Sequence, residues 1–138
     1  PNDGTDSNIL QITSNNGIII RSEGDGKLYF YHNDGNWNNF HTESLSDNVW
    51  NLWIQTWNGN EAKAYKNGME VGNGTFNTHG TTNSVDRIGT NNDNTRNIDG
   101  KIDDVRIYDK ALSPSEVFEL YRWGTRGRDL RKQLVNQR

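Results

Sequence analysis

Residues 49–71 constrain the fold of this chain most, because alternating runs there are separated by Asn-Gly dipeptides. Residues 49–57, VWNLWIQTW, alternate as a half-buried β-strand does. Hairpin turns are expected at two Asn-Gly dipeptides, Asn58-Gly59 and Asn67-Gly68. This dipeptide readily adopts the positive φ angles of a type I′ turn. The sequence therefore predicts two consecutive β-hairpins in this region, with Trp50 on the core face of the first strand.

Short β-branched or alternating runs, bounded by Asn, Asp and Gly, fill most of the remaining chain. They predict further strands over residues 9–13, 18–22, 27–32, 86–89 and 98–108, with a loop over residues 36–39. The chain has 138 residues, enough for one domain with a real core. The expected fold class is therefore all-β.

One helix is predicted near the end of the chain. Ser113 is a suitable N-cap, Pro114 suits the first helical position, and Glu116 can bond back to the cap. Gly124 is predicted to end the helix after about three turns. Because so short a helix is not stable alone, its apolar face must pack on the sheet, with Trp123 packed under the helix end.

Composition argues against several kinds of partner and chemistry. The formal net charge of −3 gives no reason to expect nucleic acid. No apolar run is long enough to span a bilayer, so membrane insertion is not expected. The chain has no cysteine and thus no disulfide or thiolate chemistry. Residues 125–138 are strongly basic and are interpreted as a C-terminal tail or linker, or alternatively as a contact for an acidic partner.

Three motifs, in this order along the chain, resemble those of a known family. They are WNLWIQTWNG over residues 50–59, AKAYKNGMEVGNG over residues 62–74, and the stretch from IGTNNDN to VFELY over residues 88–121. With these motifs the chain resembles the laminin-G-like, concanavalin A-like lectin/glucanase jelly-roll domains. The resemblance implies an antiparallel two-sheet jelly-roll sandwich over residues 1–124, closed by one short C-terminal helix.

The start of the chain departs from that family pattern. Such domains normally begin with a strand that pairs beside the last one, followed by a strand of the F-x-V-x-x-W type, and neither is recognisable before Asn8. We therefore expect the first strands to come from an upstream part of the same polypeptide or from another subunit, or to be replaced by a variant arrangement.

Catalysis is not expected. Retaining glycoside hydrolases that share this fold carry carboxylates as E-x-D-x-x-E on one strand, and no such pattern occurs here. Asp103 and Asp104 are adjacent on a predicted strand, so they would point to opposite faces. The sequence therefore predicts a protein that is not an enzyme.

A structural Ca²⁺ is a possible cofactor. Asp103 would share its strand face with Val105 and Ile107 at the edge of the core, and some domains of the superfamily hold calcium with the matching Asp. The alternative is that Asp103 caps a turn or pairs with one of the arginines at 87, 96 and 106. Asn91 and Asp93, in an oxygen-rich loop, form a second candidate, with turn formation as the alternative.

Carbohydrate binding is the leading functional hypothesis, because sugars need an aromatic platform beside amide and carboxylate groups. One face of the strand at 49–57 has that composition, and nearby aromatic residues could extend it. The candidate residues are Asn51, Trp53, Gln55, Trp57, Tyr29, Tyr31 and Trp37. The alternative is that these tryptophans are core packing.

Two functions follow from these readings. The first is a non-catalytic carbohydrate-binding or adhesion module of a larger secreted or surface protein, with glycans or other surface proteins as partners. The alternative is a structural or assembly domain of a surface layer or virion spike that binds no glycan. Either would lie outside the cell, on a cell surface or on a virion surface.

Overall fold

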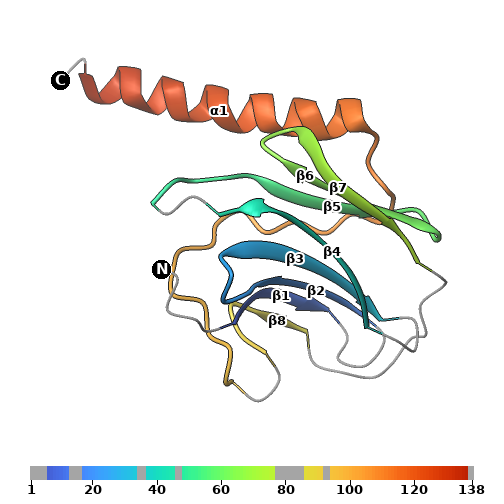
Figure 1. Ribbon diagram of the computed structural model, residues 1–138. Coiled ribbons are helices and arrows are strands. Elements are labelled where there is room, and N and C mark those ends of the chain that lie inside the picture. The colour runs from blue at the N-terminus through green and yellow to red at the C-terminus, as the bar shows by residue number, and fades with distance from the viewer. Residues whose placement is uncertain are drawn as a thin grey trace.

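The computed structural model arranges the chain in three layers (Figure 1), with helix α1 lying over a three-stranded sheet that in turn lies over a five-stranded sheet. The structure describes residues 6–12, 17–33, 37–45, 48–76, 86–91 and 94–136. Both sheets are antiparallel, which confirms the expected two-sheet sandwich with one helix.

The five-stranded sheet has the order β4-β3-β2-β1-β8. Its strands are β1 (Ser7–Ile12), β2 (Ile18–Ser22), β3 (Lys27–Asn33), β4 (Trp37–Ser44) and β8 (Arg87–Ile88). Strand β4 starts inside the segment that the sequence predicts as a loop, so that prediction is wrong. Pairing with β3 imposes the extended conformation there, although Asn-rich residues have low intrinsic strand propensity.

The three-stranded sheet has the order β5-β6-β7 and contains the two predicted hairpins. Its strands are β5 (Trp53–Trp57), β6 (Glu61–Lys66) and β7 (Met69–Thr75). At the second turn Asn67 and Gly68 both have positive φ, at 53° and 86°, as a type I′ turn requires. The Asn67 side chain also accepts a hydrogen bond from the Leu52 N–H (2.9 Å) and donates one to Asn51 (3.0 Å).

The main core lies between the two sheets. Leu28 and Phe30 of β3 are fully buried there, and the Phe30 ring stacks on Phe40 of β4 at 5.3 Å. From the other sheet, Trp53 packs against the same cluster with its ring 6.3 Å from Phe30. Side chains on β3 alternate between the sheet faces, so Leu28 and Phe30 point inward and the residues between them point outward.

Helix α1 (Pro114–Asn136) covers the outer face of the three-stranded sheet (Figure 1). Its predicted cap is confirmed, because the Ser113 N–H donates to Glu116 Oε2 (2.8 Å) and the Glu116 N–H donates to Ser113 Oγ (3.3 Å). Val117 is fully buried in a small cluster with Tyr65 and Leu112, and the half-buried side chains of Ile54 and Leu120 pack against it.

The predicted end of the helix is wrong, since α1 continues past Gly124 to Asn136. A glycine inside a helix costs only about 1 kcal/mol, and no proline follows it. Residues 125–136, interpreted from the sequence as a tail or linker, are therefore helical. Trp123, expected under the helix end, is instead 65% exposed, and Trp50, expected in the core, is 54% exposed.

The predicted strand over residues 98–108 is also wrong. The alternation is present, but none of the backbone hydrogen bonds between described residues involves residues 101–108. Asp104 has a φ of 55°, which breaks the extended conformation. Val105 and Ile107, expected to face the core, are exposed, because an alternating pattern forms a strand only where a neighbouring strand accepts its hydrogen bonds.

Candidate functional site

The face of the five-stranded sheet that points away from the three-stranded sheet collects aromatic and charged side chains. We call it the outer sheet face and define it by Arg21 on β2, Tyr29 and Tyr31 on β3, and His41 on β4. Arg21 pairs across the strands with Tyr29, and Tyr29 pairs with His41. These four side chains lie on one face because their neighbours in sequence point into the core.

The aromatic side chains of this face form a row. The Tyr29 and Tyr31 rings lie 6.0 Å apart and only 25° from parallel. On its other side Tyr29 meets the His41 ring at 5.2 Å. His41 and the neighbouring Asn39 are exposed. The row is thus a ridge of rings that solvent can reach, next to an exposed amide.

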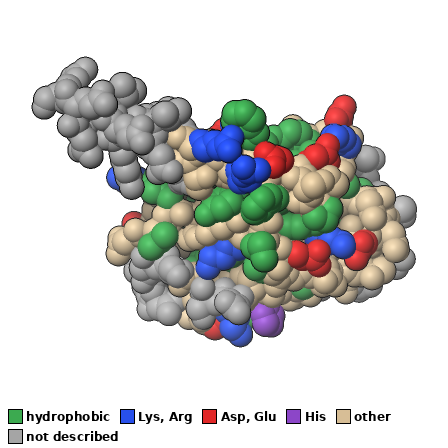
Figure 2. Space-filling model, turned by 90° about the horizontal axis from the view of Figure 1, so that it is seen from above, with side chains coloured by type: hydrophobic (Ala, Val, Ile, Leu, Met, Phe, Trp, Pro, Cys, Tyr) green, Lys and Arg blue, Asp and Glu red, His purple; other side chains and the backbone are tan. Residues whose placement is uncertain are grey.

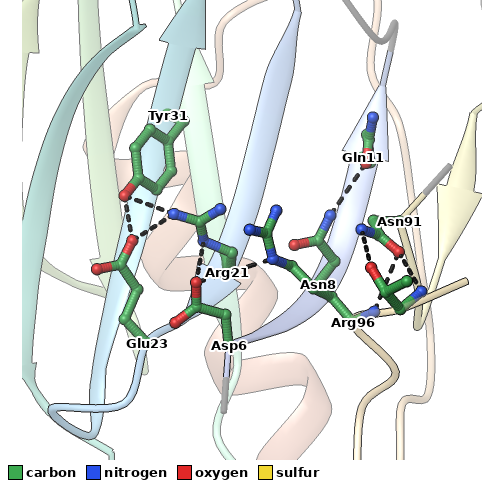
Figure 3. A network of polar contacts seen from close by, with 9 residues as sticks. Asp6, Asn8, Gln11, Arg21, Glu23, Tyr31, Asn91 and Arg96 are labelled. Atoms are coloured by element: carbon green, nitrogen blue, oxygen red, sulfur yellow. Dashed lines mark hydrogen bonds and ion pairs between the residues drawn. The ribbon is translucent and has the colours of Figure 1, made fainter. Parts of the chain in front are cut away.

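A network of hydrogen bonds and ion pairs beside the row joins β2 and β3 to residues next to β1 (Figure 3). Arg21 Nη2 donates to Glu23 Oε1 (2.5 Å) and to the Tyr31 hydroxyl (2.8 Å), and that hydroxyl donates to the same Glu23 oxygen. The Arg21 guanidinium also lies 4.6 Å from the Tyr31 ring centre. Further along, the Asp6 carboxylate lies 4.0 Å from Arg21 Nε and 3.8 Å from Arg96 Nε.

The network fixes the protonation states of its members. Burial, together with the hydrogen bond to Glu23, raises the pKa of Tyr31 to about 12. Burial alone would raise the pKa of Glu23, but the hydrogen bonds from Tyr31 and Arg21 outweigh it and lower that pKa. Asp25, which accepts bonds from the Lys27 N–H (3.0 Å) and the Tyr29 hydroxyl (2.9 Å), also has a lowered pKa. At neutral pH the tyrosines are therefore neutral and both carboxylates are ionised.

The outer sheet face is closed on the β1 side by the segment around Asn91. Asn8 and Gln11 of β1 are buried and hydrogen-bonded to each other (3.0 Å), and the Asn8 N–H donates to the Arg96 carbonyl (3.1 Å). Asn91 holds this segment in place, because its Oδ1 accepts bonds from the N–H groups of Thr95 (2.8 Å) and Arg96 (3.1 Å). The accessible part of the face is thus the part built by β2, β3 and β4.

The structure separates the residues that the sequence grouped as one sugar site. Tyr29 and Tyr31 lie on the outer sheet face, whereas Trp53 packs on Phe30 between the sheets. Gln55 and Trp57 also point into that interior. The Gln55 amide nitrogen lies 2.6 Å from Nε2 of the buried His32, and the Trp57 ring lies 6.1 Å from the His32 ring.

Of the two remaining candidates, only Asn51 has a side chain that the structure describes, and it lies away from the outer sheet face. The Asn51 side chain is engaged with Asn67 at the β6–β7 turn. The Trp37 side chain lies outside the part of the structure that is described. Sequence reasoning missed Arg21, Glu23, Asp25 and His41. The signal that could have found them is strand register, because a hairpin between β2 and β3 places Arg21 opposite Tyr29.

The described residues do not fit the predicted calcium site. Asp103 is exposed rather than at the core edge, and its Oδ1 accepts a hydrogen bond from the Asp104 N–H (2.8 Å). Arg106 pairs with Asp104 (2.8 Å), not with Asp103. Asn91 Oδ1 is occupied by two backbone N–H groups, as given above, and Asp93 lies outside the described residues. Within the described chain no three His, Cys, Asp or Glu side chains are grouped to hold a metal.

Calcium binding therefore stays a prediction from the sequence. Bound calcium should raise the melting temperature of the chain, because a ligand that binds the folded state alone stabilises it. Equal melting temperatures in calcium and in a chelator would remove the hypothesis.

The family comparison agrees with this architecture. The model of the Concanavalin A-like lectin/glucanases superfamily matches residues 1–118. A crystal structure of an S-layer domain-containing protein from Clostridium thermocellum is 26% identical, with 86% of this chain and 64% of that chain covered and a TM-score of 0.47. This chain thus spans less than two thirds of that structure. No curated protein matches. Among the described helices, none has the length and apolarity needed to cross a membrane.

Proposed function

This chain belongs to the Concanavalin A-like lectin/glucanases superfamily, and from that premise we propose that it is a non-catalytic module that binds carbohydrate through the outer sheet face. The observation that carries the proposal is the row of rings at Tyr29, Tyr31 and His41 beside ionised carboxylates. A sugar presents an apolar C–H face to such rings and hydroxyl groups to the charged rim.

The hydrogen-bonding groups are already held in position before a ligand arrives. Arg21 and Tyr31 both bind Oε1 of Glu23, so Glu23 Oε2 can accept a sugar hydroxyl. His41 and Asn39 offer further polar atoms at the edge of the row. A site that is ordered in advance loses less conformational entropy on binding, which favours affinity for a small ligand.

The same carboxylates argue for binding without hydrolysis. A glycosidase needs one carboxylic acid that stays protonated, and so has a raised pKa, opposite an ionised partner. Beside the outer sheet face, both Glu23 and Asp25 have lowered pKa values, so neither can donate a proton at neutral pH.

Substitutions at Tyr29 test the proposal. A glycan array screened with the chain should give at least one ligand, and Tyr29→Ala should weaken its binding by about tenfold or more. Burying the apolar surface of a side chain of this size contributes about 1.5–3 kcal/mol, and about 1.4 kcal/mol is a tenfold change in affinity. Tyr29→Phe, which keeps the ring, should retain most of the affinity. Tyr108→Ala serves as the matched control, since Tyr108 is a 43% exposed tyrosine outside the face. If Tyr29→Ala binds as tightly as the unaltered chain, this face is not the site.

We further propose that the module is part of a larger secreted or surface-displayed protein, as is usual for glycan-binding domains that act outside the cell. An N-terminal secretion signal in the parent polypeptide is the expected finding. If the array gives no ligand, the alternative of a structural or assembly domain is favoured, because the chain also exposes apolar side chains such as Ile107 and Trp123.

A further inference from the structure

The nearly balanced net charge of the chain hides a strong asymmetry. Residues 122–138 contain six Lys and Arg residues and one Asp, which gives +5. The whole chain carries −3, so residues 1–121 carry −8. Charges of opposite sign on separate parts of one molecule favour contacts between copies in which unlike parts meet.

Most of this charge, +4, lies on residues 122–136, the C-terminal part of α1, which extends beyond the sheets (Figure 1). We call residues 122–136 the basic arm. Its Trp123 is 65% exposed, and the Arg126 guanidinium lies 5.8 Å from the Trp123 ring. The arm sequence has apolar residues at Trp123, Leu130 and Leu134. Spacings of seven and four residues place these positions along one side of a helix with 3.6 residues per turn. The arm is thus amphipathic as well as basic.

The surface around α1 also exposes apolar side chains (Figure 2), which lie among charged ones. Phe118 of α1 and Met69 of β7 are 43% and 66% exposed. Phe118, however, lies over the β6–β7 turn, within 3.1 Å of the place where a Cβ on Gly68 would stand, so it belongs to the contact between helix and sheet. The basic arm begins after that contact and continues outward along α1 (Figure 1).

A surface of complementary character lies just before the helix. Residues 99–109, which we call the exposed segment, contain Val105, Ile107 and Tyr108, which are 45%, 76% and 43% exposed. The same segment carries Asp99, Asp103 and Asp109, whose carboxylates make no ion pair with any residue that the structure describes. The whole segment holds four Asp residues against Lys101 and Arg106, so its net charge is −2.

We propose that the basic arm of one copy docks on the exposed segment of a second copy. The exposed segment is apolar and acidic, and the arm is basic with the exposed Trp123 near its start, so the two are opposite in charge. Within one copy, Trp123 of the arm and the apolar side chains of the exposed segment are all exposed, so they do not cover each other. Pairing of two basic arms is disfavoured because each carries net positive charge. The contact is between unlike surfaces, so two copies can exchange arms reciprocally, or several copies can join in a ring or an open chain.

Sedimentation velocity of the full chain over a range of concentrations tests the proposal. Two charge-reversed variants are needed, R126E/R128E/K132E in the basic arm and D99K/D103K/D109K in the exposed segment. The unaltered chain should associate at low salt and dissociate at about 0.5 M NaCl, where screening reduces the attraction between exposed charges. Each variant alone should associate at least about tenfold more weakly, because each brings like charges together.

Mixing the two variants is the sharper measurement. The acidic arm of the arm variant then meets the basic segment of the segment variant. The basic arm of the segment variant meets the acidic segment of the arm variant. Both contacts are attractive, so association should return. Circular dichroism and melting temperature establish that both variants fold. Three results overturn the proposal. They are an unaltered chain that stays monomeric at every concentration, variants that associate as the unaltered chain does, and a mixture that does not associate. Binding of the arm to anionic lipid vesicles without self-association would assign it to a membrane surface and would also overturn the proposal.

Discussion

Replacing Trp53 by alanine separates core packing from ligand binding on β5. The indole ring lies between the sheets, against a buried cluster of Ile20, Leu28, Phe30 and Ala64, and Lys66 Nζ lies 5.5 Å from the ring centre. Removing a large aromatic side chain from a core costs about 3–5 kcal/mol. Because Trp53 is half-buried, we expect the lower end, a loss of about 3 kcal/mol in the free energy of unfolding.

Equilibrium unfolding in urea measures this loss. With a slope of about 2 kcal/mol per molar urea, the midpoint should fall by about 1.5 M. Trp123→Ala is the matched control, because the same residue type is 65% exposed there, and it should change stability by less than about 0.5 kcal/mol.

Glycan affinity decides between the two roles. Under conditions where the Trp53→Ala variant is folded, it should bind a glycan ligand as tightly as the unaltered chain does. The reasoning is refuted if the variant keeps its urea midpoint and loses binding. In that case the face of β5 that carries Trp53 would be the binding surface, as the sequence first suggested.

Three further outcomes follow from single residues. Gly74→Ala should destabilise the fold by about 1–3 kcal/mol in urea, because a Cβ there would stand 2.7 Å from Phe76 Cζ in the tight contact between β7 and the core, and an unchanged midpoint would contradict that packing. The pKa of Glu116 is lowered to about 2 by Lys110 and by the Ser113 cap, so the chain should lose stability as the pH falls from about 4.5 towards 2, and Glu116→Gln should flatten that part of a pH series of thermal melts. The pKa of Tyr31 is raised to about 12, so stability should fall as the pH rises from 10 to 12, and an equal loss in Tyr31→Phe would show that the network is not its source.

Features fixed by a few neighbouring residues could be predicted from the sequence. The Asn67-Gly68 turn has the expected positive φ angles, and Ser113 and Glu116 form the expected cap, because each depends on local backbone geometry. The all-β class also followed, since most strands are marked by alternation and by Asn and Gly at their ends. The two-sheet architecture was implied by the resemblance to a known family.

Features that depend on distant partners could not be predicted. Both faces of the strand at 49–57 carry tryptophan, so alternation alone could not show that Trp53 points inward while Trp50 remains exposed. The strand pattern at 98–108 does not reveal whether a neighbouring strand is present to accept its hydrogen bonds. The same holds for the outer sheet face, which Arg21, Tyr29 and His41 form only once the register of three strands is known.

The most direct test of the glycan-binding account is an NMR titration of the ¹⁵N-labelled chain with a glycan from the array. The account predicts that the largest chemical-shift changes fall on Tyr29, Tyr31 and His41, while Trp53 and Trp57, which point between the sheets, change little. Large changes at those tryptophans, with the signals of the outer sheet face unmoved, would contradict it.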